Sequence, residues 1–94
     1  MNIQTILAEK KAWRTHGKRV KQLPIDYQIV YTEIQKYVFK IGIVDPTEMM
    51  EVLIGIVELF EAGASRKQPV LDVTGKDIAN FCDEIIANYE TYTD

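Results

Sequence analysis

One segment, residues 45–63 (DPTEMMEVLIGIVELFEAG), constrains the fold of this chain more than any other. Asp45 is a favoured N-cap, Pro46 suits the first helical position, and Gly63 is placed for a left-handed C-cap. Between these ends apolar side chains cover most of the helix circumference. The remaining residues form one narrow stripe: Glu48, Glu51, Gly55, Glu58 and Ala62. A helix that is apolar nearly all round must be buried on most sides, so the other segments are expected to pack around it.

Two helices are predicted before this segment. In residues 3–21 the helical spacing of Ile3, Ile6, Leu7 and Trp13 predicts a core-facing stripe. In residues 24–41, Pro24 is read as the first helical position. A clean apolar face follows it, made by Tyr27, Val30, Tyr31, Ile34, Tyr37, Val38 and Ile41. Gly42 is expected to end this helix.

The last helix is predicted at residues 75–92, with Thr74 as its N-cap and Asp77 closing a capping box. Its buried face is expected to include Phe81 and Cys82. A loop at residues 64–73 precedes it, and residues 70–73 are expected to fold back onto the core as a single tight turn. No alternating run indicates a strand. The predicted fold is all-α, with four short helices (3–21, 24–41, 46–62 and 75–92) in one compact domain spanning residues 1–94.

Length and composition limit the classes of protein to consider. A chain of 94 residues has room for one modest core. Cys82 is the single cysteine, which excludes an intramolecular disulfide. Residues 1–7 lack the basic lead and apolar region of a signal peptide, and the central helix carries four glutamates, which excludes a membrane span. We therefore expect a cytoplasmic protein that does not insert into membranes.

Charge is divided unevenly along the chain. Residues 1–21 hold six Lys or Arg against Glu9 alone, a balance of +5, whereas residues 22–94 hold five against thirteen acidic residues, a balance of −8. Such asymmetry suggests a partner-binding surface. The candidate contact residues are Lys10, Lys11, Arg14, Lys18, Arg19 and Lys21.

Several interpretations of this basic run stay open. It could bind the phosphates of a nucleic acid, form a solvated helix face, complement the acidic remainder within or between subunits, or lie on a membrane. The overall acidity of the chain and the absence of a recognition-helix or zinc-finger pattern weigh against DNA binding.

The acidic stripe of the central helix is the second candidate. Glu48, Glu51, Glu58 and Glu61 lie on adjacent turns and could hold a divalent cation or serve as acid and base. Helical di-iron sites, however, use Glu-x-x-His pairs, and the only histidine is His16. No metal site is therefore predicted. Gly55 would let another backbone approach closely, so we expect a subunit interface at Glu51, Gly55 and Glu58, and a homodimer.

No catalytic or cofactor motif is present. Cys82 and His16 are the only residues for thiol chemistry, and Cys82 falls on the apolar face of the last helix. Ser65 is the only serine and lacks a nucleophile-elbow context. The sequence therefore predicts neither an enzyme nor a cofactor.

Three stretches resemble a known family. The motifs K-x-W-R, KRVKxLPxDY and VTGxDxAxFCDE, within a similarity that covers nearly the whole chain, are similar to those of DUF1048, a bacterial domain-of-unknown-function family. The resemblance implies a small helical domain with a left-handed superhelix, in a cytoplasmic protein encoded near PadR-like transcriptional regulators. Family members often continue with a charged helical stretch beyond the region matching residues 92–94. Some members are described as ferritin-like DNA-binding proteins, but the helices predicted here are short and lack histidine-containing iron ligands.

We therefore expect a non-enzymatic helical module that acts through a protein partner, in a transcription-linked setting. Non-specific DNA binding through the same basic residues is the alternative hypothesis, and a small metal protein or enzyme is the third.

Overall fold

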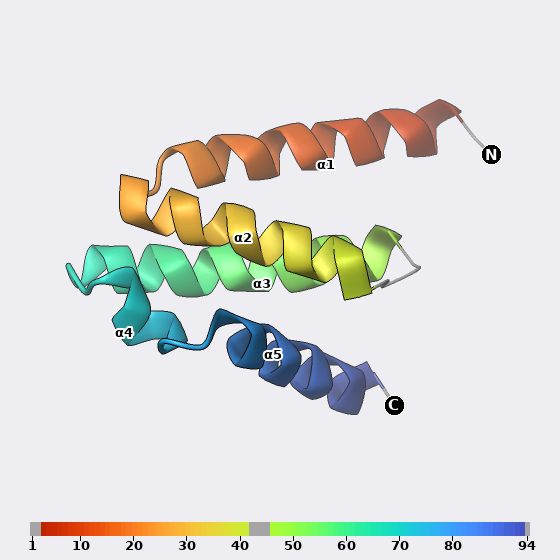
Figure 1. The fold of residues 1–94 in the computed structure, drawn as a ribbon. Helices are drawn as coiled ribbons and strands as arrows, with labels where there is room; N and C mark the ends of the chain where they lie inside the picture. The colour runs from red at the N-terminus through yellow and green to blue at the C-terminus, as the bar shows by residue number, and fades with distance from the viewer. Residues whose placement is uncertain (1–2, 42–45, 94) are drawn as a thin grey trace.

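The structure, a computed structural model, describes residues 3–41 and 46–93. Within these residues the helices are α1 (Ile3–Lys21), α2 (Ile25–Ile41), α3 (Pro46–Ser65), α4 (Val70–Thr74) and α5 (Ile78–Thr93), and no strand is present. Figure 1 shows α2 and α3 at the centre, α1 along one side, and α4 with α5 along the other. α1 and α3 run in the same direction, and α2 runs opposite to both. The all-α prediction is confirmed, with α4 as an additional short helix.

The central position of α3 follows from its apolar circumference. Five α3 side chains are almost fully buried, more than from any other helix: Val52, Leu53, Ile56, Val57 and Phe60. α2 adds Tyr27, Tyr31, Ile34 and Val38, and α5 adds Phe81 and Cys82. The core therefore lies between α2, α3 and α5.

The start of α1 does not join this core. Ile3 is 72% exposed and Leu7 is 59% exposed, so the prediction that both are core residues is wrong. Trp13 packs partly against the core and His16 is buried. Leu7 precedes His16 by nine residues, and nine steps of about 100° place it on the opposite face of the helix. The side chain of Ile6 lies outside the described part of the structure.

The end of α3 differs from the prediction. Gly63 is not the C-cap, because the helix continues to Ser65 and the left-handed residue is Lys67, with φ of 58°. The Gln68 N–H donates to the Gly63 carbonyl (3.1 Å) and the Lys67 N–H donates to the Ala64 carbonyl (3.0 Å). This pair of bonds is a Schellman motif, which satisfies the last helical carbonyls.

Gly63 has a different role, which is to let α4 and α2 approach α3. A Cβ atom at this position would lie 2.5 Å from Cγ2 of Val73 and 2.7 Å from the Tyr27 hydroxyl. That hydroxyl donates to the Gln68 carbonyl (2.7 Å) and so ties α2 to the turn after α3. The absence of a side chain at Gly63 therefore permits this packing.

The cap of α5 also differs from the prediction. Thr74 is the last residue of α4, and its hydroxyl bonds to the Gly75 carbonyl (2.7 Å). Asp77 caps α5 instead, because its carboxylate accepts from the Asn80 N–H at 3.0 Å. The helix thus begins at Ile78, three residues later than predicted, because Gly75 with φ of 79° separates the two helices.

The turn between α1 and α2 is held by Gln28. Its amide nitrogen donates to the carbonyls of Lys21 (3.1 Å) and Leu23 (2.8 Å), which lie at and just beyond the end of α1. The predicted roles of Gly42 and Asp45 fall outside the described residues. In residues 3–41 and 46–93, no helix has the length and apolar character needed to cross a membrane.

Candidate interaction surface

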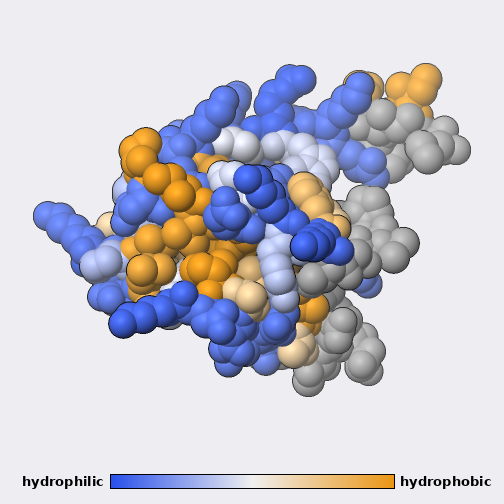
Figure 2. Space-filling model, in the orientation of Figure 1, coloured by the Kyte–Doolittle hydropathy of each residue, from blue (hydrophilic) through white to orange (hydrophobic). Residues whose placement is uncertain are grey.

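The basic residues of α1 form an exposed arc, which we call the cationic surface: Lys10, Lys11, Arg14, Lys18 and Lys21. At about 100° per residue these five positions span an arc roughly 100° wide. His16, Trp13 and Val20 lie outside this arc and face the protein. Figure 2 shows hydrophilic side chains projecting along the α1 edge of the molecule. The structure thus brings five of the six predicted contact residues onto one solvent-facing surface.

Arg19, the sixth residue, points towards α3. Its guanidinium forms a two-bond ion pair with Glu61, with Nη2–Oε1 at 2.6 Å and Nε–Oε2 at 3.1 Å. The hydrogen bond raises the pKa of Arg19 and lowers that of Glu61. Both side chains stay about one-third or more exposed, so the pair contributes modestly to stability. It fixes the C-terminal half of α1 against α3, and Arg19 therefore belongs to the fold rather than to the cationic surface.

His16 holds α1 against α2. Its Nε2 shares a hydrogen bond with the Tyr31 hydroxyl, and the Trp13 ring meets it edge-on at 5.9 Å. Burial, and then the neighbouring charge of Arg19, lower the pKa of His16. A protonated ring would need acceptors for both N–H groups, and among the described residues Nδ1 has none. The neutral ring is therefore the form that the fold accommodates.

This arrangement predicts a loss of stability in mild acid. The unfolded chain binds the His16 proton near the ordinary pKa of 6.5, whereas the folded protein binds it only at lower pH. The free energy of unfolding should be largest above this pH and fall as the pH decreases from about 7 to 5. Urea unfolding at several pH values would measure the slope. His16→Gln should flatten it, and an unchanged slope in that variant would contradict the assignment.

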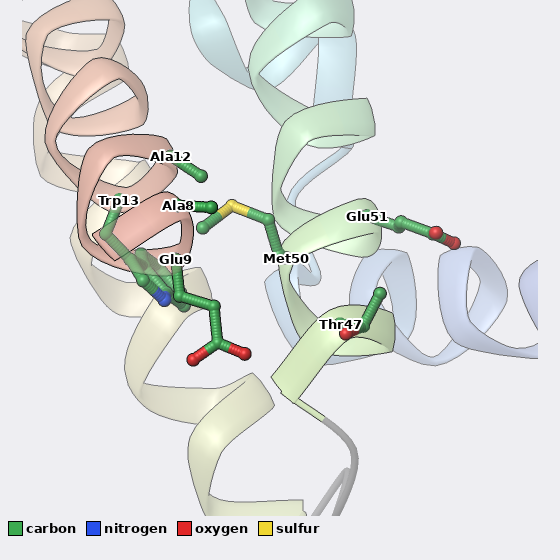
Figure 3. Close-up of a pocket in the computed structure, with 7 residues that line it drawn as sticks. All are labelled: Ala8, Glu9, Ala12, Trp13, Thr47, Met50 and Glu51. Carbon is green, nitrogen blue, oxygen red and sulfur yellow. The ribbon is translucent and has the colours of Figure 1, made fainter. Parts of the chain in front are cut away.

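A groove separates α1 from α3 beside the cationic surface. Two cavities of about 330 and 400 Å³ lie along it, and both are lined by Ala8 and Ala12 of α1. Figure 3 shows the Met50 side chain reaching from α3 towards these two alanines, while Glu51 points away from α1. Ile54 continues the groove towards the C-terminal end of both helices. Small residues on α1 thus leave an apolar groove open to solvent, a feature that the sequence reasoning missed.

The predicted acidic stripe lies next to this groove. Glu51, Gly55 and Glu58 are all exposed on α3. A Cβ at Gly55 would meet no neighbouring atom within 4 Å, so packing among the described residues does not require a glycine there. Within residues 3–41 and 46–93, no group of three or more His, Cys, Asp and Glu side chains could hold a metal ion. The stripe is therefore a negatively charged edge to the groove.

Cys82 belongs to the hydrophobic core. Its side chain is fully buried on α5, and burial raises the pKa of its thiol to about 11. A nucleophilic cysteine needs a thiolate and access to substrate. The thiol therefore stays protonated at neutral pH and packs as a small apolar side chain.

Comparisons with known proteins agree with this architecture. The family model described as "Protein of unknown function (DUF1048)" matches residues 4–94. A solved structure of a DUF1048 protein from Bacillus cereus ATCC 10987, described as a left-handed superhelix, is 42% identical in sequence and has a TM-score of 0.76. The alignment covers 82% of this chain and 95% of that one. No curated protein matches the chain. On the family match and this identity, the chain belongs to the DUF1048 family.

Proposed function

We propose that this protein is a non-enzymatic interaction module that binds an acidic segment of a protein partner through the cationic surface of α1. The observation that carries this proposal is the exposure of Lys10, Lys11, Arg14, Lys18 and Lys21 on one face of a helix that the core contacts from other sides. Surface lysines and arginines grouped in this way create a positive potential that attracts acidic partners.

Ile3 and Leu7 extend the cationic surface with apolar contacts. At about 100° per residue, both fall within about 60° of Lys10 on the helix circumference. Figure 2 shows hydrophobic atoms at the N-terminal end of the α1 edge. A surface that is apolar at one end and cationic along the rest suits an amphipathic acidic helix or strand, because such a partner offers both kinds of contact.

This combination favours a protein over DNA. Glu51 and Glu58 lie on the adjacent face of α3 and would repel a phosphate backbone that followed the groove. Exposed aliphatic side chains such as Ile3 and Leu7 gain little from contacts with phosphates. The transcription-linked setting implied by the family resemblance suits a protein partner that is itself a regulator.

Capture from the native host, compared between two charge variants, tests the proposal. Lys10→Glu/Arg14→Glu/Lys21→Glu reverses three charges on the cationic surface. Lys36→Glu/Lys40→Glu/Lys76→Glu makes the same change in net charge at exposed positions elsewhere. A specific partner should be captured by the wild type and by the second variant, and lost with the first. Titration calorimetry with that partner should show at least about tenfold weaker binding for the first variant.

Two results would contradict this proposal. Equal capture by all three proteins would remove the cationic surface as the binding site. Binding of duplex DNA at about 50 mM salt, with an affinity that falls steeply as salt increases, would replace the protein partner with a nucleic acid.

A further inference from the structure

We propose that two copies of this chain associate through the exposed face shared by α1 and α3. In this arrangement Lys11 and Lys18 of each α1 lie over Glu51 and Glu58 of the other copy's α3. The inference goes beyond the proposed function and does not rest on it. It uses two members of the cationic surface, Lys11 and Lys18, whereas Lys10, Arg14 and Lys21 stay outside the contact.

The lysine pair on α1 and the glutamate pair on α3 have the same spacing along their helices. Lys11 and Lys18 are seven residues apart, as are Glu51 and Glu58. Seven residues correspond to nearly two helical turns and a rise of about 10.5 Å. Thr15 follows Lys11 by four residues, and Gly55 follows Glu51 by four residues. Each therefore lies between the two charged residues of its pair, on the same face of its helix. Two lysines on one helix can therefore meet two glutamates on another at the same time.

The contacts between α1 and α3 within one copy determine which residues of the two helices lie at the same height along the helix axes. Ala8 and Ala12 line the groove at the level of Met50, and Arg19 pairs with Glu61. Because α1 and α3 run in the same direction (Figure 1), a residue of α1 lies roughly level with the α3 residue about 40 positions later. Lys11 is thus near the level of Glu51, and Lys18 is near the level of Glu58.

A two-fold axis parallel to the helices keeps each lysine level with the corresponding glutamate of a second copy. Rotation about such an axis, placed between α1 and α3 on their exposed face, sets each α1 over the other copy's α3. It changes no position along the helices, so each lysine meets a glutamate at its own level. An axis perpendicular to the helices would instead stack α1 on α1 and place lysines against lysines. Charge complementarity therefore selects the parallel axis, in an isologous contact.

Apolar surface and close approach supply the rest of the contact. Ala8, Ala12, Met50 and Ile54 line the groove that the second copy would cover. Gly55 offers no side chain, so the helix that carries Thr15 can approach its backbone. Two helices about 30 Å long offer a face of roughly 500–600 Å² per copy, which is at the low end for specific interfaces. The dimer should therefore be weak, reversible and sensitive to salt.

Sedimentation of the whole chain over a concentration series tests for the dimer. The wild type should shift from monomer to dimer between about 1 µM and 1 mM at low ionic strength, and the shift should weaken in about 1 M salt. A strict monomer throughout this range at low salt would overturn the proposal.

Two charge-reversal variants test the pairing itself. Lys11→Glu/Lys18→Glu and Glu51→Lys/Glu58→Lys should each be monomeric, because like charges then face each other. An equimolar mixture of the two should form a heterodimer, since both sets of contacts become complementary again. Lys10→Glu/Lys21→Glu, with the same charge change on the outer side of α1, should dimerise as the wild type does.

The equimolar mixture of the two variants distinguishes specific lysine–glutamate pairing from a general effect of net charge on association. If the mixture stays monomeric although circular dichroism shows both variants to be folded, the lysine–glutamate register is wrong. If the two variants dimerise on their own as well as the wild type does, the interface lies elsewhere. Loss of partner capture without loss of the dimer in Lys10→Glu/Arg14→Glu/Lys21→Glu would show that partner binding and dimer formation depend on different members of the cationic surface.

Discussion

Replacing Phe60 with alanine is expected to destabilise this protein by about 3–5 kcal/mol. Phe60 is fully buried on α3, where its ring lies 5.2 Å from the Tyr27 ring of α2 and 6.5 Å from the Phe81 ring of α5. Truncation removes the side chain that contacts both neighbouring helices and leaves a cavity. A domain of this size has a total stability of about 5–14 kcal/mol, so this single change should remove a large fraction of it.

The adjacent residue provides a matched control. Leu59 lies on the same helix but is 40% exposed, so Leu59→Ala should cost about 1 kcal/mol or less. Urea unfolding followed by circular dichroism would measure both variants. Equal losses at the two positions would mean that Phe60 does not join α2, α3 and α5 in the way described.

Gly63→Ala should be the second strongly destabilising change, by roughly 1–3 kcal/mol. Alanine normally favours a helix over glycine by about 1 kcal/mol, so an increase in stability would be expected from helix propensity alone. At this site the added methyl group would lie 2.5 Å from Val73 and 2.7 Å from the Tyr27 hydroxyl. It would therefore displace α4 and weaken the hydrogen bond from Tyr27 to Gln68.

Two other helical glycines allow the propensity effect to be measured separately. A methyl group at Gly17 or Gly55 would meet no neighbouring atom within 4 Å, so alanine there should stabilise the monomer by about 0.5–1 kcal/mol. Thermal unfolding of the three variants would compare them directly. A stabilising Gly63→Ala would show that α3 and α4 are packed less closely than the structure indicates.

The main helices were predictable from local signals. Pro24, Pro46 and the hydrophobic periodicity placed α1, α2 and α3 within a few residues of their observed bounds. The caps were harder to assign, because the same residue type serves several purposes. Gly63 resembles a C-cap glycine but is required for close packing, while Lys67 adopts the left-handed conformation without being a glycine.

The orientation of α1 was not predictable from its apolar residues. Ile3, Leu7 and Trp13 resemble one stripe, but buried contacts of His16 with Tyr31 turn Leu7 outward. Periodicity counts apolar residues and gives a buried histidine no weight. The basic residues of the candidate site were identifiable from charge alone. The pairing of Arg19 with Glu61 was not, because it joins residues 42 positions apart.

Two side-chain contacts that join α1 to the neighbouring helices, at His16 and Arg19, lie in the C-terminal half of α1. Helical turns whose side chains are not buried against the core are stabilised only by the intrinsic stability of the helix, which is marginal for short segments in water. The turns that carry Ile3 and Leu7 should therefore open and close more readily than the rest of the helix. A partner that binds them would also favour their helical form, so local helix formation and recognition would be a single coupled equilibrium, and part of the binding free energy would go into ordering this end.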